Sequence, residues 1–294
     1  DEVLPQPDGG RKEYFDENGN VTDVVEWFGY KLHLLIDTRH EVALGYKVTA
    51  TGTGDGETLP ELLDQAQGAL PQKRIETVAY DRAADTNPVH KDLHNRNIRP
   101  VIETRELWKG NPDRTLPGTE DRPVPVTYNE EGTVYCWDES GNEPVRRRMA
   151  YCGHEKSRGT LKYRCPALAH DWPCGSERKC NCGKTYGLTV RVKREIDLRR
   201  FPPVPRATQT FERLYRGRPA VERVNARLKL FWGADDGNTT GAARFHGLVA
   251  TVMTVHLGFA TVLAGTHRPP LTLGVTGVAP VREALLKSRP KPDR

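Results

Sequence analysis

The sequence is short of several kinds of residue, and each shortage narrows the class of protein to which it can belong. It has only two Met residues, at positions 149 and 253, and no secretory signal peptide opens it. One long apolar run occurs, at 248–264, which is marginally short for a membrane span and contains His256. We therefore expect a buried core helix at 248–264, no membrane contact, and a chain that is an internal fragment of a longer protein.

Cysteine is also scarce, and all six cysteines lie between positions 136 and 182. Without a secretory signal, disulfides are disfavoured, which leaves metal binding or free thiols. The short pairs are C-x-H and C-x-C rather than the C-x2-C pairs of zinc ribbons, so a structural Zn²⁺ site and unliganded thiols both remain open. Cys136 lies outside the tighter cluster, and the candidate zinc ligands are Cys152, His154, Cys165, Cys174, Cys180 and Cys182.

Acidic residues are slightly outnumbered, since 44 Lys and Arg against 39 Asp and Glu give a net charge of +5. This balance allows a nucleic acid as partner without requiring one. Hydrophobic residues make up 36% of the chain, which suits a folded protein with a modest core. The length of 294 residues predicts either one large domain with an insertion or two domains.

The beginning of the chain has the pattern of a hairpin followed by a helix. Two β-rich runs, 27–37 and 41–52, are separated by three residues. After a glycine-rich turn, Thr58 and Glu61 match a capping box, which predicts a helix that continues to about Gly68. The sequence before 27 is polar and predicts turns rather than a buried strand.

The next segments continue the alternation of strand and helix. The pattern predicts strands at 74–81 and 98–105 with a helix at 87–96 between them. Pro100 favours a sheet edge for the second of these strands. The order strand, strand, helix, strand, helix, strand indicates a mixed α/β sheet flanked by helices.

The remainder of the chain differs from its beginning in helical periodicity and in the frequency of turns. Residues 106–200 lack helical periodicity and are rich in turns, so we expect a Cys-rich insertion there. Helical patterns return from 208 onward. The expected organisation is therefore a core of 1–105 plus 201–265, the insertion at 106–200, and a loosely ordered tail at 266–294.

The stretch YRGRPAVERVNARLK, at 215–229, contains a single acid, Glu222, among five Lys and Arg residues. On an α-helix, residues seven apart share a face, which brings Glu222 and Lys229 together. Tyr215 and Arg218 join that face if the helix extends upstream, whereas Pro219 favours a start near Arg218. On charge pattern alone, ordinary surface ion pairs of Glu222 with Arg218 or Lys229 are the simpler interpretation.

The excess of basic residues extends beyond this one helix. Twelve Lys and Arg residues lie between 189 and 229, with only four acids. A stripe of this kind suits contacts with phosphate groups, which Arg can bind in a bidentate manner.

The spacing Y-x2-R-x3-E-x6-K, filled by Tyr215, Arg218, Glu222 and Lys229, resembles the signature of insertion-sequence DDE transposases. Upstream, FGYKLHLLID followed by GTGDGETLPELL resembles the second and third strands and the first helix of that family. VAYDRAAD resembles the segment after its fourth strand, and DLRRFPPVPRATQTFERLYRGRPAVERVNARLK is similar to the region that leads to the family's glutamate. The resemblance covers about 27–105 and 195–264.

The resemblance implies a ribonuclease H-like fold in which three carboxylates hold two divalent ions, Mg²⁺ or Mn²⁺. By position, Asp81 corresponds to the second aspartate and Glu222 to the glutamate. Oxygen ligands suit such ions, which can stabilise the attacking and leaving oxygens of a phosphodiester. The resemblance further implies cleavage and strand transfer of double-stranded DNA, a homo-oligomer on the DNA, and a prokaryotic cytoplasmic location. The expected DNA-binding residues are Tyr215, Arg218, Arg223 and Lys229.

The first aspartate of the family has no counterpart in the sequence, because the early acids lie in polar, turn-rich segments: Asp1, Asp8, Asp16 and Asp23. We expect this ligand upstream of residue 1. Near the second aspartate, Asp85 is a weaker alternative ligand to Asp81. Two other functions remain open: an inactive DNA-binding protein derived from a transposase, and a ribonuclease H-like nuclease that cuts without joining.

Overall fold

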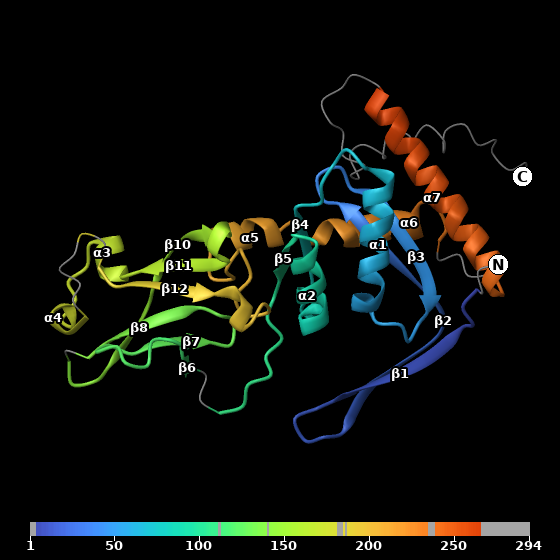
Figure 1. Cartoon of the computed structure of the whole chain (residues 1–294). Coiled ribbons are helices and arrows are strands. Elements are labelled where there is room, and N and C mark those ends of the chain that lie inside the picture. Colours follow the sequence, from blue (N-terminus) through green and yellow to red (C-terminus); the bar gives the residue numbers. More distant parts are fainter. Residues whose placement is uncertain are drawn as a thin grey trace, which may run out of the picture. The chain divides into compact units, whose positions relative to one another are not determined.

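The computed structural model describes residues 4–110, 113–139, 141–180, 185, 187–234 and 239–265. Helices and strands alternate along this part of the chain, so the expected mixed α/β class is confirmed (Figure 1). The tail expected at 266–294 and the candidate ligand Cys182 lie outside the described residues.

The chain forms two compact units, one from residues 1–74 with 217–294 and one from residues 75–216. These boundaries differ from the expected core of 1–105 plus 201–265 around an insertion at 106–200, and that division stays a prediction.

The first unit contains an antiparallel sheet in the order β1-β2-β3, made of β1 (Asp8–Phe15), β2 (Val21–Asp37) and β3 (Val42–Ala50). The long strand β2 pairs with β1 over its first half and with β3 over its second half. The hairpin expected from 27–37 and 41–52 is therefore confirmed. The expectation of turns before Trp27 is wrong, because Asp8 begins β1 and Asp23 lies in β2; both strands are mostly exposed there and show no apolar alternation.

Helices cover both faces of this sheet. Because side chains alternate along a strand, Leu32 and Leu34 of β2 face α6 (Pro219–Leu230) and α7 (Ala242–Gly265) in one hydrophobic cluster. On the other face, α1 (Asp55–Ala69) packs against β3. A Cβ added to Gly45 of β3 would lie 3.0 Å from the carbonyl oxygen of Leu62, so glycine permits this close approach.

The helix α1 begins earlier than the sequence pattern predicted. Its first residue is Asp55, preceded by Gly54 as N-cap, and Thr58 lies inside the helix with its hydroxyl donating to the Asp55 carbonyl at 3.1 Å. The expected capping box of Thr58 and Glu61 is therefore wrong, although the helix ends at Ala69, next to the expected Gly68.

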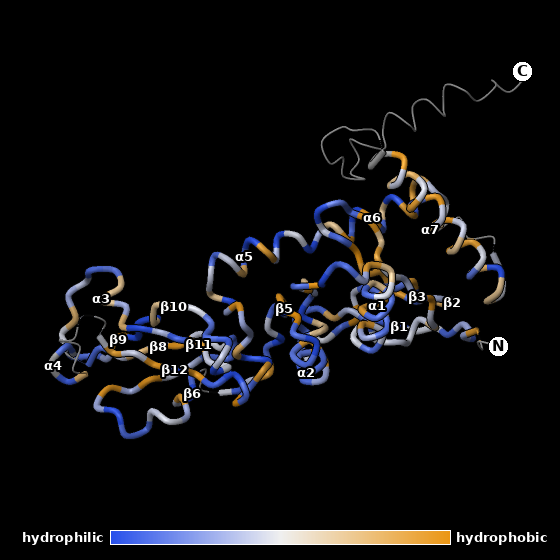
Figure 2. Tube along the Cα trace, turned by 45° about the horizontal axis from the view of Figure 1, so that its top comes forward, coloured by the Kyte–Doolittle hydropathy of each residue, from blue (hydrophilic) through white to orange (hydrophobic). Residues whose placement is uncertain are grey.

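The helix α7 is long and apolar enough to cross a membrane by length and composition alone, which is weak evidence for a span. It lies on β3 through one face, where Val249, Val252, Met253 and His256 are buried. Only 22% of its most apolar window is buried, and Figure 2 shows apolar residues along its length. The expectation of a buried core helix is thus confirmed for one face only.

The second unit begins with a two-stranded parallel sheet of β4 (Thr77–Tyr80) and β5 (Arg99–Ile102), connected by α2 (Asn87–Asn95). Both strands and the helix were predicted at these positions. The helix α5 (Gln209–Tyr215) packs on this sheet, and Val101, Val204 and Phe211 form the hydrophobic cluster there.

The region 106–200 contains two further antiparallel sheets that periodicity did not reveal. One has the order β6-β7-β8-β9, with β6 (Asp113–Thr115), β7 (Val126–Asn129), β8 (Val134–Asp138) and β9 (Val145–Arg148). The other has the order β10-β11-β12, with β10 (Ala150–Glu155), β11 (Thr160–Arg164) and β12 (Thr189–Lys193). Two short helices, α3 (Pro166–His170) and α4 (Glu177–Cys180), lie between β11 and β12.

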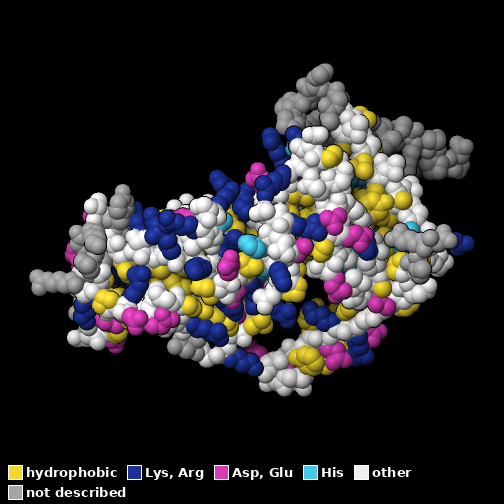
Figure 3. All heavy atoms as spheres, viewed as in Figure 1, with side chains coloured by type: hydrophobic (Ala, Val, Ile, Leu, Met, Phe, Trp, Pro, Cys, Tyr) yellow, Lys and Arg dark blue, Asp and Glu magenta, His cyan; other side chains and the backbone are white. Residues whose placement is uncertain are grey.

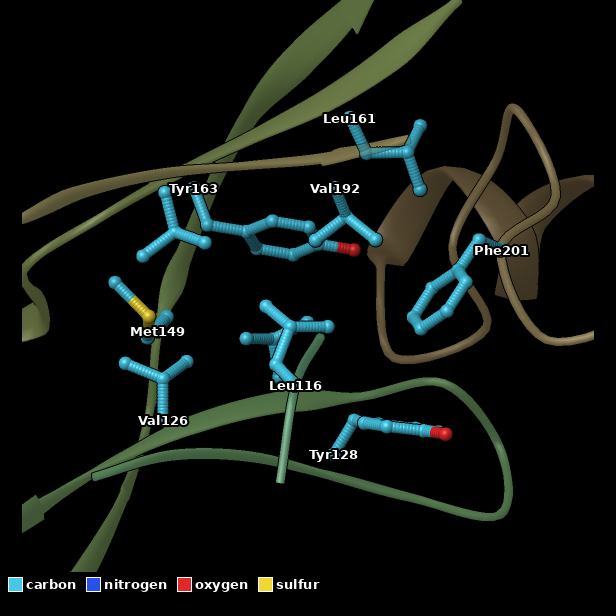
Figure 4. Packing of buried hydrophobic residues seen from close by; sticks show 10 residues of the cluster. Leu116, Val126, Tyr128, Met149, Leu161, Tyr163, Val192 and Phe201 are labelled. Atoms are coloured by element: carbon cyan, nitrogen blue, oxygen red, sulfur yellow. The ribbon is translucent and has the colours of Figure 1, made fainter. Parts of the chain in front are cut away.

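The two sheets share one hydrophobic core (Figure 4). Val126, Tyr128 and Met149, from or beside the first sheet, meet Leu161, Tyr163 and Val192 of the second. Leu116 and Phe201, from neighbouring loops, complete the packing. The turn-rich segment is thus a folded β structure with its own core.

Candidate functional site

Asp81 directly follows β4 and is the N-cap of the 3-10 turn η1 (Arg82–Ala84). Its Oδ1 accepts a hydrogen bond from the Ala83 main-chain N–H at 2.9 Å, which fixes the carboxyl group at the end of the strand. Among the described residues, no hydrogen bond engages Oδ2. The half-buried carboxylate can therefore bind a further group through that oxygen.

The other end of the same turn is held by Asp85, the C-cap of η1, whose side chain is 0% exposed. Its Oδ1 lies 2.9 Å from Nε2 of His90 and accepts from Nη2 of Arg206 at 3.1 Å. Its Oδ2 accepts from the main-chain N–H of Arg105 and from Nε of Arg199, both at 2.8 Å. Both oxygens of Asp85 are thus engaged, so Asp85 anchors the turn rather than offering a second metal ligand.

Charges in this buried cluster stabilise one another. Burial alone would raise the pKa of Asp85, but the hydrogen bonds from His90 and Arg105 and the charge of Arg206 lower it on balance. For His90, burial is the main cause of a lowered pKa, and it outweighs the hydrogen bond to Asp85. Asp85 is therefore ionised and His90 neutral near pH 7, which leaves Asp85 as the counter-charge of Arg199 and Arg206.

Glu222 lies in the first turn of α6, with Pro219 at the first position of the helix. The helix begins here and not upstream, because α5 ends at Tyr215; of the two starts open from the sequence, the one near Arg218 is correct. Arg218 Nη2 lies 3.0 Å from Glu222 Oε1, and the Glu222 side chain is 60% exposed. The simple surface ion pair is thus present, yet the carboxylate remains open to solvent.

Two other arginines of α6 bind an acid from the distant turn between β2 and β3. Nε of Arg223 donates to Glu41 Oε1 at 2.7 Å, and Nη1 of Arg227 donates to Glu41 Oε2 at 2.6 Å. Arg227 is only 1% exposed, and Glu41 adopts a left-handed backbone with φ of 54°. Burial raises the pKa of Glu41, but hydrogen bonds from Arg227 and Arg223 lower it on balance. This cluster attaches α6 to the sheet, a role of Arg223 and Arg227 that the local sequence did not reveal.

The remaining signature residues occupy separate helices. Lys229 lies on α6, exposed and seven residues after Glu222, so the two side chains share a face. Tyr215 is the last residue of α5 and stacks on Phe211 with ring centroids 5.7 Å apart. Tyr215 therefore contributes to the hydrophobic packing of the second unit through its contact with Phe211.

Most cations of the basic stretch 189–229 have hydrogen-bond or ion-pair partners within the protein. Acidic side chains or main-chain carbonyls accept from nine of its twelve cations: Arg191, Arg194, Arg199, Arg200, Arg206, Arg216, Arg218, Arg223 and Arg227. Figure 3 shows further Lys and Arg side chains gathered over β10 to β12 on the face in view. The stretch is therefore not a bare cationic stripe, because much of its charge stabilises the fold.

The cysteines of the second unit fall into two groups. Cys136, Cys165, Cys174 and Cys180 line one small cavity. Cys152 is exposed and His154 half-buried, both on β10, and neither lines that cavity. Cys136, Cys152 and Cys174 carry free thiols, whereas Cys180 is disulfide-bonded.

Metal binding at the predicted residues remains a prediction. Within the described parts of the chain, no group of three or more His, Cys, Asp or Glu side chains is arranged to hold a metal ion. Asp81 and Glu222 belong to different units, and each offers a carboxylate oxygen to solvent. Such hard, exposed oxygen atoms are the ligands that Mg²⁺ and Mn²⁺ prefer, so the two residues fit the ions implied by the resemblance.

Comparison with known proteins gives one match. The model of the family described as "Transposase DDE domain" matches residues 11–257, which is most of the chain. No curated protein matches the chain.

Proposed function

Because the chain belongs to the family of transposase DDE domains, we propose that it is the catalytic part of an insertion-sequence transposase that cuts DNA and joins the cut ends to a target. The proposal includes a ribonuclease H-like arrangement of the core, in which Asp81 and Glu222 each supply one carboxylate ligand for a divalent cation. The observation that carries it is the support of Asp81, whose oxygen is presented at the end of β4 by a turn anchored through buried Asp85.

Two Mg²⁺ or Mn²⁺ ions at such carboxylates supply Lewis-acid chemistry to the attacking and leaving oxygens of a phosphodiester. The contribution of the protein is to hold the carboxylates rigidly. For Asp81 this rigidity comes from the Ala83 N–H and from the hydrogen bonds at Asp85. For Glu222 it comes from helix α6, which Arg223 and Arg227 attach to Glu41.

The same face of α6 supports a role in binding DNA. Arg218 and Lys229 flank Glu222 on the helix surface, where they would contact phosphates on either side of the reacting bond. If a cation were held by the Glu222 carboxylate, Arg218 would exchange its ion pair with Glu222 for a contact with phosphate. Arg223 contributes less than expected from sequence, because Glu41 already binds its guanidinium. Tyr215 would add a ring surface for a nucleotide.

The test uses the longest natural protein that contains this chain, incubated with supercoiled plasmid DNA and Mg²⁺ or Mn²⁺. We expect metal-dependent nicking that falls by at least about 100-fold in Asp81→Asn and in Glu222→Gln, because each variant loses a charged ligand. Asp92→Asn is the matched control, since Asp92 is a surface acid paired with Arg96 and should keep full activity.

The products separate the three candidate functions. Joined strands identify a transposase, whereas nicks without joined strands identify a nuclease. DNA binding without nicking in the natural protein identifies an inactive DNA-binding relative and would refute the catalytic proposal.

A further inference from the structure

Four cysteines from four separate places in the second unit line one cavity. Cys136 lies on β8, Cys165 is the N-cap of α3, Cys174 precedes α4, and Cys180 ends α4. In sequence these residues span 45 positions and have no C-x2-C pair among them. Their convergence on one cavity is therefore a product of the fold that spacing could not show.

One cavity brings the four cysteine side chains together: Cys165 is buried, and Cys136, Cys174 and Cys180 are half-buried. A bound cation would compensate the charge of thiolates gathered in this way, as occurs in metal sites.

The part of the second unit around this cavity, with helices α3 and α4, has few other stabilising interactions. The helix α3 has five residues and α4 has four, lengths that are not stable in isolation. Their hydrophobic cluster contains only two buried residues, Cys165 and Ala167, with Cys174, Cys180 and Leu188 packed against it. A small segment with so few apolar contacts is the kind that proteins stabilise with a metal ion.

We propose that Cys136, Cys165, Cys174 and Cys180 bind one structural Zn²⁺ ion. Four sulfur ligands match the tetrahedral coordination of structural zinc. The other charged residues that line the cavity are Asp138 and Arg147, which pair with each other at 3.6 Å. In the structure the four sulfur atoms do not reach a common ligand position, so the side chains must turn inward when the ion binds.

This ligand set adds Cys136 to the sequence-based set and omits Cys152 and His154, while Cys182 of that set lies outside the described residues. Cys152 sits at the bulge of β10, where the register shifts between Tyr151 and Gly153, and its side chain is exposed. An exposed thiol on an edge strand cannot join a cavity that it does not line.

Binding requires Cys180 in its thiol form. A dithiol reductant supplies the two electrons and two protons that convert its disulfide into two thiols, and the reductant itself becomes a cyclic disulfide. Zinc then displaces a proton from each of the four ligand thiols, so that uptake of the ion releases protons into solution.

The test measures zinc in the whole protein, purified with dithiothreitol and without added chelator. We expect about one Zn²⁺ per chain by mass spectrometry of the metal, and a loss of most of it in Cys136→Ser and Cys174→Ser. Cys152→Ser is the matched control and should keep the full content. Retention of zinc in Cys136→Ser, or equal loss in Cys152→Ser, would overturn the ligand assignment.

A second measurement does not depend on whether the variants fold. The wild-type protein, stripped of zinc and titrated with Co²⁺ under reducing conditions, should show the visible bands of a tetrahedral site and strong thiolate-to-metal charge transfer. Absence of these bands in the wild type would refute a metal site in this cavity. Neither measurement involves DNA cleavage, so the outcome is independent of the transposase proposal.

Discussion

Glu41 and Asp85 are two buried acids that pair with four arginines of the basic stretch. Glu41 binds Arg223 and Arg227, and Asp85 binds Arg199 and Arg206. Three of these arginines are buried, and a buried arginine without its partner carries a large desolvation cost, so their pairs matter for the fold even though they add modest net stability; the fourth, Arg223, is half exposed.

This arrangement explains why the sequence overstated the number of cations without partners within the protein. Glu41 lies 182 positions before Arg223, and Asp85 lies 121 positions before Arg206. A charge count over 189–229 cannot include acids that reach the same cations through the fold. The assignment of Asp81 and Glu222 as metal ligands comes from the family resemblance of short segments and stays a prediction.

His256 is a buried group whose protonation state should affect stability. Its Nε2 accepts a hydrogen bond from the Ala43 N–H at 3.0 Å, so the ring is neutral in the folded protein. Burial, and secondarily the charge of Arg227, lower its pKa to about 4 from an ordinary 6.5. The unfolded chain therefore binds the proton first as pH falls, and the stabilising contribution is complete above pH 6.5 and is lost toward pH 4.

We expect the first unit of the wild-type protein to lose about 3 kcal/mol of its free energy of unfolding between pH 7 and pH 4 through His256 alone. In His256→Gln, whose amide oxygen can accept from Ala43 without titrating, that part of the pH dependence should be absent. Urea unfolding followed by the fluorescence of Trp232, which packs on His256 with ring centroids 5.3 Å apart, measures it. Equal pH slopes in the two proteins would contradict the prediction.

At the scale of elements, the turn η1 joins the strand that ends at Asp81 to the buried cluster around Asp85. Asp85→Asn removes the charge that neutralises Arg199 and Arg206 while keeping the side chain's size. We expect this substitution to destabilise the second unit by about 3–5 kcal/mol, because it leaves two buried cations without a counter-ion. Thermal unfolding followed by circular dichroism measures the effect.

The comparison variant for this element is Asp92→Asn in α2, where the acid forms a surface pair with Arg96. Its cost should be no more than about 0.5 kcal/mol. If both variants melt at the same temperature, the cluster around Asp85 does not stabilise the unit as described.

The elements themselves were predictable where one face of a strand or helix is buried. The pairing of β2 with β3, the parallel pair β4 and β5, and helix α2 follow from the sequence pattern, whereas α1 was predicted from a capping box that the structure does not contain. The arm of β1 and the first half of β2 was missed because its residues are exposed on both faces. The strands from β6 to β12 were missed because they are short and separated by many turns, so that few residues in each carry the pattern.

At the scale of the whole molecule, the net charge of +5 favours association with a polyanion, but nine of the twelve Lys and Arg residues at 189–229 have partners within the protein. We expect the logarithm of the DNA-binding constant to fall with the logarithm of salt concentration with a slope of about −2 to −4, far from the value that twelve phosphate contacts would give. Fluorescence anisotropy with a labelled duplex at several salt concentrations measures the slope.

Two substitutions sharpen this prediction. Lys229→Ala on α6 should reduce the magnitude of the slope by about 1, as expected for one lost phosphate contact. Arg191→Ala, of the same charge change, should leave the slope nearly unaltered, because Glu155 accepts from its guanidinium at 2.9 Å. An equal reduction by both variants would contradict the proposed binding face.

The arm formed by β1 and the first half of β2 extends from the rest of its unit (Figure 1), and residues 21–28 are exposed without exception. Its main-chain hydrogen bonds are therefore protected from solvent by the ladder alone, without a packed layer on either side. Amide protons of the arm should exchange with deuterium well before those of the β2–β3 pair, which α1 and α7 cover. Slow exchange in the arm would mean that another molecule shields it. The exchange rate of these amides therefore detects binding of a second molecule to the arm.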